Sequence, residues 1–260
     1  MNLHGLLFLA LAGLLGGGMN ALAGGGSFAT LPAMIAAGLP PVIANASSTV
    51  ALWPGGLAGA WTYRAGLRPI CGVAVAPALA VSFAGGLVGA VLLLVLPAHS
   101  FDVVLPWLLL LATVTLAFGR RAGEALQGRL RAAPLGTGRS SMGRRLMLAV
   151  QFLLAIYGGY FGGAVGLMMA AAWSFFGEAD LRALNAPRTL MVAAANSMAI
   201  LVFAAVGVVR WAPTLAMLAG GIAGGVVGAR IGRRLPARIT RAMTLTFATA
   251  ITAVFFARRF

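Results

Sequence analysis

Two stretches of the sequence resemble each other: AGGLVGAVLLLVLP at Ala84–Pro97 and AGGVVGARIGRRLP at Ala223–Pro236. Eight of their fourteen positions are identical at a shift of 139 residues. An internal duplication in an apolar chain is typical of secondary transporters, which bind substrate where the two copies meet. The repeat therefore predicts two homologous halves, and the rest of the sequence can be compared half against half.

A second motif repeats upstream, where Asn45-Ala46-x-x-Thr49 recurs as Asn185-Ala186-x-x-Thr189 at a shift of 140. Glycine clusters lie about twenty residues ahead of both copies. They comprise Gly24, Gly25 and Gly26 in the first half, and Gly162, Gly163 and Gly166 in the second.

The composition excludes a soluble domain. Apolar residues make up 61% of the chain and charged residues 9%, and the mean hydropathy is +0.98. Apolar runs long enough to cross a bilayer recur along the whole chain. The ~10-residue alternating segments of an outer-membrane barrel do not appear. We therefore expect an all-α, polytopic membrane protein.

The net charge of +15 comes from 19 arginines and no lysine. They cluster in short loops between apolar runs. This pattern indicates that the positive charge keeps those loops in the cytoplasm, and it does not indicate nucleic-acid binding. Cys71 is the only cysteine, which excludes an intrachain disulfide. The apolar run Leu6–Leu15 is not preceded by a basic residue, so residues 1–30 are expected to be mature structure and not a signal peptide.

The halves are expected at residues 1–120 and 146–260, joined by a linker at 121–145. The segment from Arg120 to Arg145 carries seven arginines with glycine and proline, and it reads as a cytoplasmic linker. Each half is expected to contain three spanning helices after a glycine-broken apolar segment, Leu3–Leu39 or Leu146–Gly177. Leu3–Leu39 is too long for one span and too short for two, so a re-entrant hairpin or two short helices meeting in the membrane is expected.

The arginine distribution favours inverted repeats. If each broken segment returns to its starting side, 16 arginines lie in the cytoplasm and only Arg210, Arg258 and Arg259 lie outside. If each broken segment crosses the membrane, the division is 12 to 7. The positive-inside rule favours the first arrangement, which puts both termini in the periplasm.

Enzyme motifs are not found: there is no G-x-S-x-G, no H-E-x-x-H, no P-loop and no Cys/His metal-binding spacing. We therefore expect no enzymatic activity, no cofactor and no metal. The four carboxylates, none of which lies in the middle of a span, are Asp102, Glu124, Glu178 and Asp180. The lack of a buried acidic relay fits an anionic substrate better than a cation.

The repeated polar residues are the candidates for substrate binding. Asn45, Ser48 and Thr49 are expected to open one apolar helix, and Asn185, Arg188 and Thr189 the corresponding one. They could serve as helix caps only, or two helix N-termini brought together could bind an anion. Arg188 replaces Ser48 and could hold an oxyanion through two hydrogen bonds, or it could be a topogenic arginine.

Asn196 lies on the same expected helix as Arg188, in an otherwise apolar span, where it could line the pathway or only bond across helices. The glycine breaks complete the candidate site, since glycine lets backbone approach a substrate closely. The predicted substrate-binding residues are Gly25, Gly26, Asn45, Ser48, Thr49, Gly163, Gly166, Asn185, Arg188, Thr189 and Asn196.

These motifs resemble the TauE/SafE family of sulfite exporters and sulfonate permease-like transporters. The resemblance is carried by the segment AGGGSFATLPAMIAAGLPPVIANASSTVALWPGGLAGAWTYR at Ala23–Arg64, by GGYFGGAVGLMMAAAW at Gly158–Trp173 and by NAPRTLMVAAAN at Asn185–Asn196. It implies two homologous halves and the export or uptake of small sulfur-containing anions such as sulfite or sulfonates.

A secondary transporter for such an anion, in a bacterial inner membrane, is thus the first hypothesis. A passive anion channel on the same scaffold and a membrane-embedded structural subunit are the alternatives. The expected partners are a small anion and the lipid bilayer, with no nucleic acid, and self-association into a homo-oligomer is left open.

Overall fold

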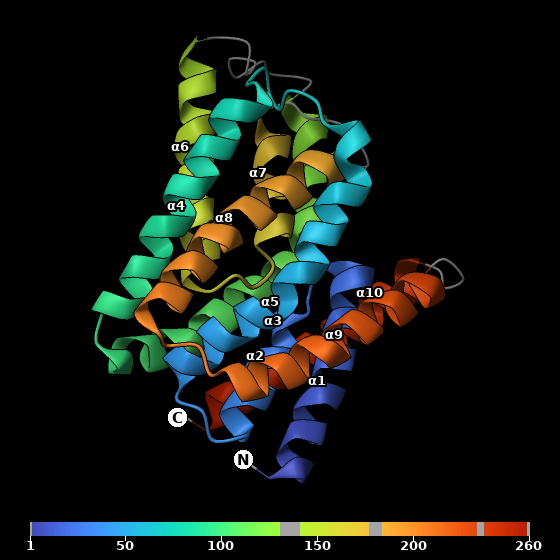
Figure 1. Cartoon of the computed structure of the whole chain (residues 1–260). Helices are drawn as coiled ribbons and strands as arrows, with labels where there is room; N and C mark the ends of the chain where they lie inside the picture. Colours follow the sequence, from blue (N-terminus) through green and yellow to red (C-terminus); the bar gives the residue numbers. More distant parts are fainter. Residues whose placement is uncertain (1, 131–140, 177–183, 233–236, 259–260) are drawn as a thin grey trace.

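The computed structural model describes residues 2–130, 141–176, 184–232 and 237–258 (Figure 1). Within these ranges the regular structure is helical, which confirms the all-α expectation for them. The helices are α1 (Leu3–Ala23), α2 (Ser27–Ala36), α3 (Pro41–Tyr63), α4 (Val75–Val95), α5 (Ala98–Leu130), α6 (Ser141–Tyr160), α7 (Val165–Phe175), α8 (Asn185–Val206), α9 (Trp211–Gly232) and α10 (Ala237–Ala257), with a short 3₁₀ turn at Arg64–Gly66.

Among the described residues, six helices are long and apolar enough to cross a bilayer: α1, α4, α5, α8, α9 and α10. Their apolar parts are 19 to 22 residues long. At 1.5 Å per residue such lengths match the ~30 Å hydrocarbon core. Helices α3 and α6 have 23 and 20 residues. They are less apolar, because α3 carries a polar run and α6 begins with arginines.

The outer surface of the helices is apolar. On α1 the side chains of Leu7 and Leu11 are 53% and 63% exposed, and on α6 Leu153 is 64% exposed. Exposed side chains of this kind are stable when lipid tails surround them. Length, hydropathy and surface together describe a multi-pass membrane protein.

Each glycine break follows a long helix and precedes a short one. The first lies between α1, with 21 residues, and α2, with 10. The second lies between α6, with 20 residues, and α7, with 11. Helices of 10 or 11 residues rise only about 16 Å, half of the hydrocarbon thickness. The prediction of two short helices was therefore wrong, whereas a hairpin of one long and one half-length helix is observed.

The chain reverses at the two breaks with left-handed backbone. Gly24 ends α1 with a φ of 78°, and Gly162 has a φ of 80°. Ala164, the residue before α7, also has a positive φ of 55°. This conformation is disfavoured for a residue with a Cβ. The second break is therefore the more strained of the two.

Two helix pairs pack backbone against backbone. Helix α1 packs on α9, and α4 packs on α6. A Cβ placed on Gly17 of α1 would fall onto the carbonyl of Gly221 in α9, and one placed on Gly89 of α4 would fall onto the carbonyl of Ile156 in α6. Glycine at such positions allows the close approach of helices in membranes. Each pair joins a helix that precedes a break to a helix that carries the repeated AGG motif.

Helices α3 and α8 lie against each other in opposite directions. The Trp53 Nε1–H donates to Ser197 Oγ at 2.9 Å, and a Cβ placed on Gly66 would lie 3.3 Å from the Cβ of Ala186. The start of α3 therefore lies near the end of α8, and the end of α3 lies near the start of α8.

Helices α5 and α10 are joined by a buried hydrogen bond between the hydroxyls of Thr113 and Thr252, which are 2.9 Å apart. These threonines are separated by 139 residues, the repeat shift. The N and C labels lie at the lower end of Figure 1, whereas α6 begins at its upper end.

Candidate functional site

Hydroxyl groups join the helices at the first break. Thr30 of α2 and Ser48 of α3 are both buried, and their hydroxyl oxygens are 2.6 Å apart. The Thr30 hydroxyl also contacts the Gly26 carbonyl oxygen at 3.2 Å. Buried hydroxyls need such partners, because leaving one unpaired costs about 1–3 kcal/mol. Ser48 therefore serves as an anchor between α2 and α3 in this conformation.

The glycines of the first break are buried against their neighbours. A Cβ on Gly26 would lie 2.6 Å from the carbonyl oxygen of Gly16 and 3.0 Å from the Cβ of Asn20, both in α1. A Cβ on Gly25 would lie 2.8 Å from the γ-methyl of Thr244. Larger residues do not fit without movement of α1 or α10, so both glycines are needed for close packing.

Asn45 reaches from the first half to the second break. Its side-chain amide donates to the carbonyl oxygen of Tyr160 at 3.0 Å, and Tyr160 is the last residue of α6. On the other side of the break, the Tyr157 hydroxyl donates to the Gly163 carbonyl oxygen at 2.9 Å. The first bond satisfies a carbonyl that the end of α6 leaves without a helical partner, and the second satisfies a carbonyl of the segment between α6 and α7.

Helix capping by the repeated asparagines was a wrong expectation. Helix α3 begins at Pro41, four residues before Asn45, because proline suits the first helical position. Helix α8 does begin at Asn185, but neither helix has a side-chain cap bond. Thr49 and Thr189 instead donate to the carbonyl oxygens of Asn45 and Asn185, at 2.9 and 2.8 Å.

The two repeated asparagines do not meet. Because α3 and α8 are antiparallel, Asn45 near the start of α3 lies by the end of α8. Ser47, two residues further along, accepts a hydrogen bond from the backbone N–H of Arg210 at 3.1 Å. Asn185 lies at the opposite end of the pair, beside Ala186 and its contact with Gly66. One shared site formed by both helix N-termini is therefore not present in this conformation.

A different helix N-terminus is surrounded by polar side chains: that of α7. The Arg188 stem packs on its first turn, since a Cβ on Gly166 would lie 3.4 Å from both Cγ and Cδ of Arg188. Two turns along α8, Asn196 faces the break, with its Oδ1 3.9 Å from a Cβ placed on Gly162. Arg188 and Asn196 thus flank the segment from Gly162 to Gly166.

The two flanking residues differ in burial and in hydrogen bonding. Asn196 Oδ1 is buried and has no hydrogen-bond partner among the described residues. Such an atom is rare in native structures and calls for a partner. Arg188 is half-buried. Asp102, whose side chain is the only described carboxylate, lies in the second turn of α5.

The start of α7 can attract an anion. The first N–H groups of a helix lack intrahelical acceptors, and the helix dipole adds positive potential there. In the first half the residue equivalent to Arg188 is Ser48, which is bonded to Thr30. The two breaks are therefore chemically different, and the positive charge is at the second one.

Of the residues at the second break, the sequence predicts Gly163, Gly166, Arg188 and Asn196 as site candidates. Gly162 and Tyr157 also lie there but were not among the predicted site residues. The glycine cluster itself was the signal for Gly162. Tyr157 carried no signal, because its role depends on a bond to the break that only the fold creates. Among the described residues, no cluster of three or more His, Cys, Asp or Glu side chains could hold a metal ion.

Comparison with known proteins gives one match. The sequence model of a protein family described as "Sulfite exporter TauE/SafE" matches residues 9–255. No curated protein and no solved structure matches the chain.

Proposed function

The chain belongs to the TauE/SafE sulfite exporter family, and from this premise we propose that it is a secondary transporter of a small, sulfur-containing anion such as sulfite or a sulfonate. The family match covers nearly the whole chain and both glycine breaks. A bacterial inner membrane is the proposed location.

The observation that carries the proposal is the polar surround of the α7 N-terminus. Arg188 packs on Gly166, and Asn196 Oδ1, which has no hydrogen-bond partner among the described residues, faces Gly162. A sulfite or sulfonate group has several oxygens that accept hydrogen bonds. Arg188 would supply charge and a planar pair of donors, and the first N–H groups of α7 would supply further donors. The Asn196 amide would donate through Nδ2 only after rotation of its side chain, because the atom that faces Gly162 in this conformation is the acceptor Oδ1.

Glycine allows this contact by leaving space beside the backbone. At Gly166 a methyl group would touch the Arg188 stem at 3.4 Å, so only a small residue leaves room for a ligand there. The remaining predicted residues, Gly25, Gly26, Asn45, Ser48, Thr49, Asn185 and Thr189, stay proposals for substrate contact in other states of the cycle. In this conformation several of them bond to protein groups instead.

Inverted repeats are the proposed architecture, with halves at 1–120 and 146–260 and a cytoplasmic linker at 121–145. Three observations support it. The equivalent helices α3 and α8 are antiparallel, and α1–α9 packing has a counterpart in α6–α4 packing. Thr113 and Thr252, one repeat apart, bond to each other, as residues near a two-fold axis do. Transporter repeats of this kind rock against each other around a fixed site.

The transport proposal is tested in proteoliposomes that contain the purified full-length protein. Radiolabelled sulfite and a panel of sulfonates and carboxylates are supplied outside, with and without an imposed ion gradient. We expect saturable flux of sulfur-containing anions that accumulates label against its own gradient. Flux that only equilibrates would favour a channel, and no flux of any anion in the panel would contradict the proposal.

The architecture is tested separately by reporter fusions. A periplasm-specific reporter at the C-terminus should be active, because the arrangement that keeps 16 arginines in the cytoplasm puts the C-terminus in the periplasm. A fusion within the linker is the control and should be active only with a cytoplasmic reporter. Cytoplasmic reporter activity at the C-terminus would reject the inverted arrangement.

A further inference from the structure

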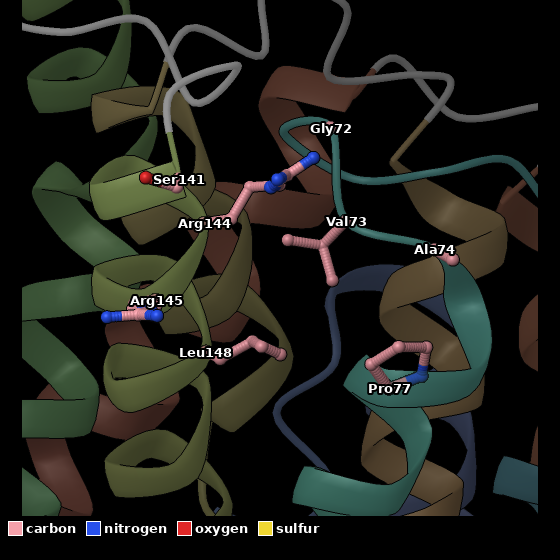
Figure 2. A pocket seen from close by; sticks show the side chains of 8 residues that line it. All are labelled: Gly72, Val73, Ala74, Pro77, Ser141, Arg144, Arg145 and Leu148. Atoms are coloured by element: carbon pink, nitrogen blue, oxygen red, sulfur yellow. The ribbon is translucent and has the colours of Figure 1, made fainter.

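A cavity away from the transport site lies where α4 and α6 begin. Its volume is about 460 Å³ (Figure 2). It is lined from one side by Gly72, Val73, Ala74 and Pro77, and from the other by Ser141, Arg144, Arg145 and Leu148. The close-up shows Arg144 extended from α6 toward the turn at Gly72.

The cavity is charged at its rim and apolar further in. Arg144 and Arg145 are exposed and lie in the first turns of α6. Leu148 follows one turn deeper along that helix, and Pro77 faces it from the first turn of α4. The apolar residues therefore lie on the side of the bilayer, since α4 continues into the membrane as a candidate span. This order, positive charge outside and apolar surface inside, matches an amphiphile with an anionic head.

Among the described residues, no carboxylate lies near the two arginines. Asp102 is the acidic residue whose side chain the structure describes, and it lies at the start of α5. In Figure 1 that end of α5 is at the bottom of the molecule, whereas α6 begins at the top. No described carboxylate can thus neutralise Arg144 or Arg145.

We propose that this cavity binds an anionic phospholipid, with the phosphate at Arg144 and Arg145 and one acyl chain along Leu148 and Pro77. On the proposed topology the cavity opens at the cytoplasmic leaflet. That leaflet carries the negative surface potential, and basic pockets between transmembrane helices at this depth suit phospholipid heads. The site is also at the start of the α4–α6 pair, one of the two tight contacts between the halves. A bound lipid would cover the beginning of that contact.

The experiment is native mass spectrometry of the full-length protein in detergent, titrated with phosphatidylglycerol or with zwitterionic phosphatidylcholine. We expect selective binding of phosphatidylglycerol. One basic residue near the membrane surface contributes roughly fivefold in affinity, so Arg144→Gln should weaken binding about fivefold and the double variant with Arg145→Gln about 25-fold. Arg230→Gln is the matched control, because it removes one exposed arginine outside the cavity, and it should leave binding unchanged.

Two further arms separate a lipid from a soluble anion. Leu148→Gln keeps both charges and should weaken phosphatidylglycerol but not glycerol 3-phosphate. Equal affinity of the wild-type protein and the double arginine variant for phosphatidylglycerol would overturn the proposal. So would displacement of the lipid by glycerol 3-phosphate at an equal concentration, because the acyl chain would then contribute nothing.

Discussion

Adjacent glycines in the repeated motif should respond in opposite ways to the same substitution. Gly224 and Gly225 both lie in α9, where α9 packs on α1. A Cβ placed on Gly224 would fall onto the carbonyl oxygen of Leu14 and lie 2.7 Å from its Cα, whereas a Cβ on Gly225 would meet nothing within 4 Å. Gly224→Ala therefore inserts a methyl group between two backbones, and Gly225→Ala inserts it into open space.

The difference in unfolding free energy between the two variants follows from a gain in helix propensity and a cost of overpacking. Alanine in place of glycine inside a helix gains about 0.5–1 kcal/mol, and both variants gain it equally. Ordinary contact of a Cβ begins at 3.4 Å. The contact with the Leu14 Cα alone would move α9 and α1 apart by about 0.7 Å, and the closer carbonyl oxygen requires a larger movement. Overpacking of this kind costs about 1–3 kcal/mol. We thus expect Gly225→Ala to be more stable than wild type, and Gly224→Ala to be about 1–3 kcal/mol less stable than Gly225→Ala.

The measurement is equilibrium unfolding of both purified variants in the same detergent, followed by tryptophan fluorescence. Gly85→Ala is an independent check, since Gly85 is the counterpart of Gly224, and its Cβ would lie 2.7 Å from the carbonyl oxygen of Phe152 in α6. It should be destabilised like Gly224→Ala. Equal unfolding free energies for Gly224→Ala and Gly225→Ala would refute the backbone contact between α1 and α9.

Three further sets of substitutions test the glycine breaks, the charge of Arg188 and the buried polar network around Gln151. Gly26→Val and Gly166→Val should both abolish flux in proteoliposomes without loss of membrane insertion. Gly166→Ala should retain more flux than Gly26→Ala, because its Cβ meets only side-chain atoms, at 3.4 Å, whereas a Cβ on Gly26 meets a backbone carbonyl. Arg188→Lys should raise the apparent KM for the anion about tenfold, which corresponds to ~1.4 kcal/mol, and Arg188→Gln should raise it further. An unchanged KM in Arg188→Lys would mean that this arginine only sets the membrane topology. Gln151→Leu should cost about 1–3 kcal/mol of unfolding free energy, since it leaves the buried Trp173 Nε1–H without its acceptor at 3.0 Å, and the cost should shrink in a Trp173→Phe background.

The duplication, the apolar spans and the positions of the breaks were predictable, because each depends on local composition. Glycine clusters loosen a helix wherever they occur, and Gly24 and Gly162 do mark the two reversals. The AGG motif was predictable as a packing surface, since only small residues let two membrane helices approach closely. The helices that pack against this motif were not predictable, because the sequence does not indicate which helix surface the motif contacts.

The grouping of the candidate residues in space could not be predicted from the sequence. The sequence places Asn45 and Asn185 at equivalent positions, and equivalence suggested that they meet. They lie instead at opposite ends of an antiparallel helix pair, a consequence of topology that no local pattern encodes. The true neighbour of Arg188 is Gly166, 22 residues earlier in the chain, and the start of α7 became a candidate only through that contact.

The two kinds of contact in the molecule differ in how easily they can change. Helices α1 and α6, which precede the breaks, are fixed by backbone contact to α9 and α4 of the other half. The short helices after the breaks also depend on side chains: α2 on the Thr30–Ser48 hydroxyl pair, beside the close approach of Gly26 to Gly16, and α7 in part on the Arg188 stem. Rotamer changes cost far less than the separation of packed backbones. A transport cycle would therefore keep the cross-half pairs intact and alter the contacts of α2 and α7, and on the α7 side those contacts include the charge proposed to hold the anion.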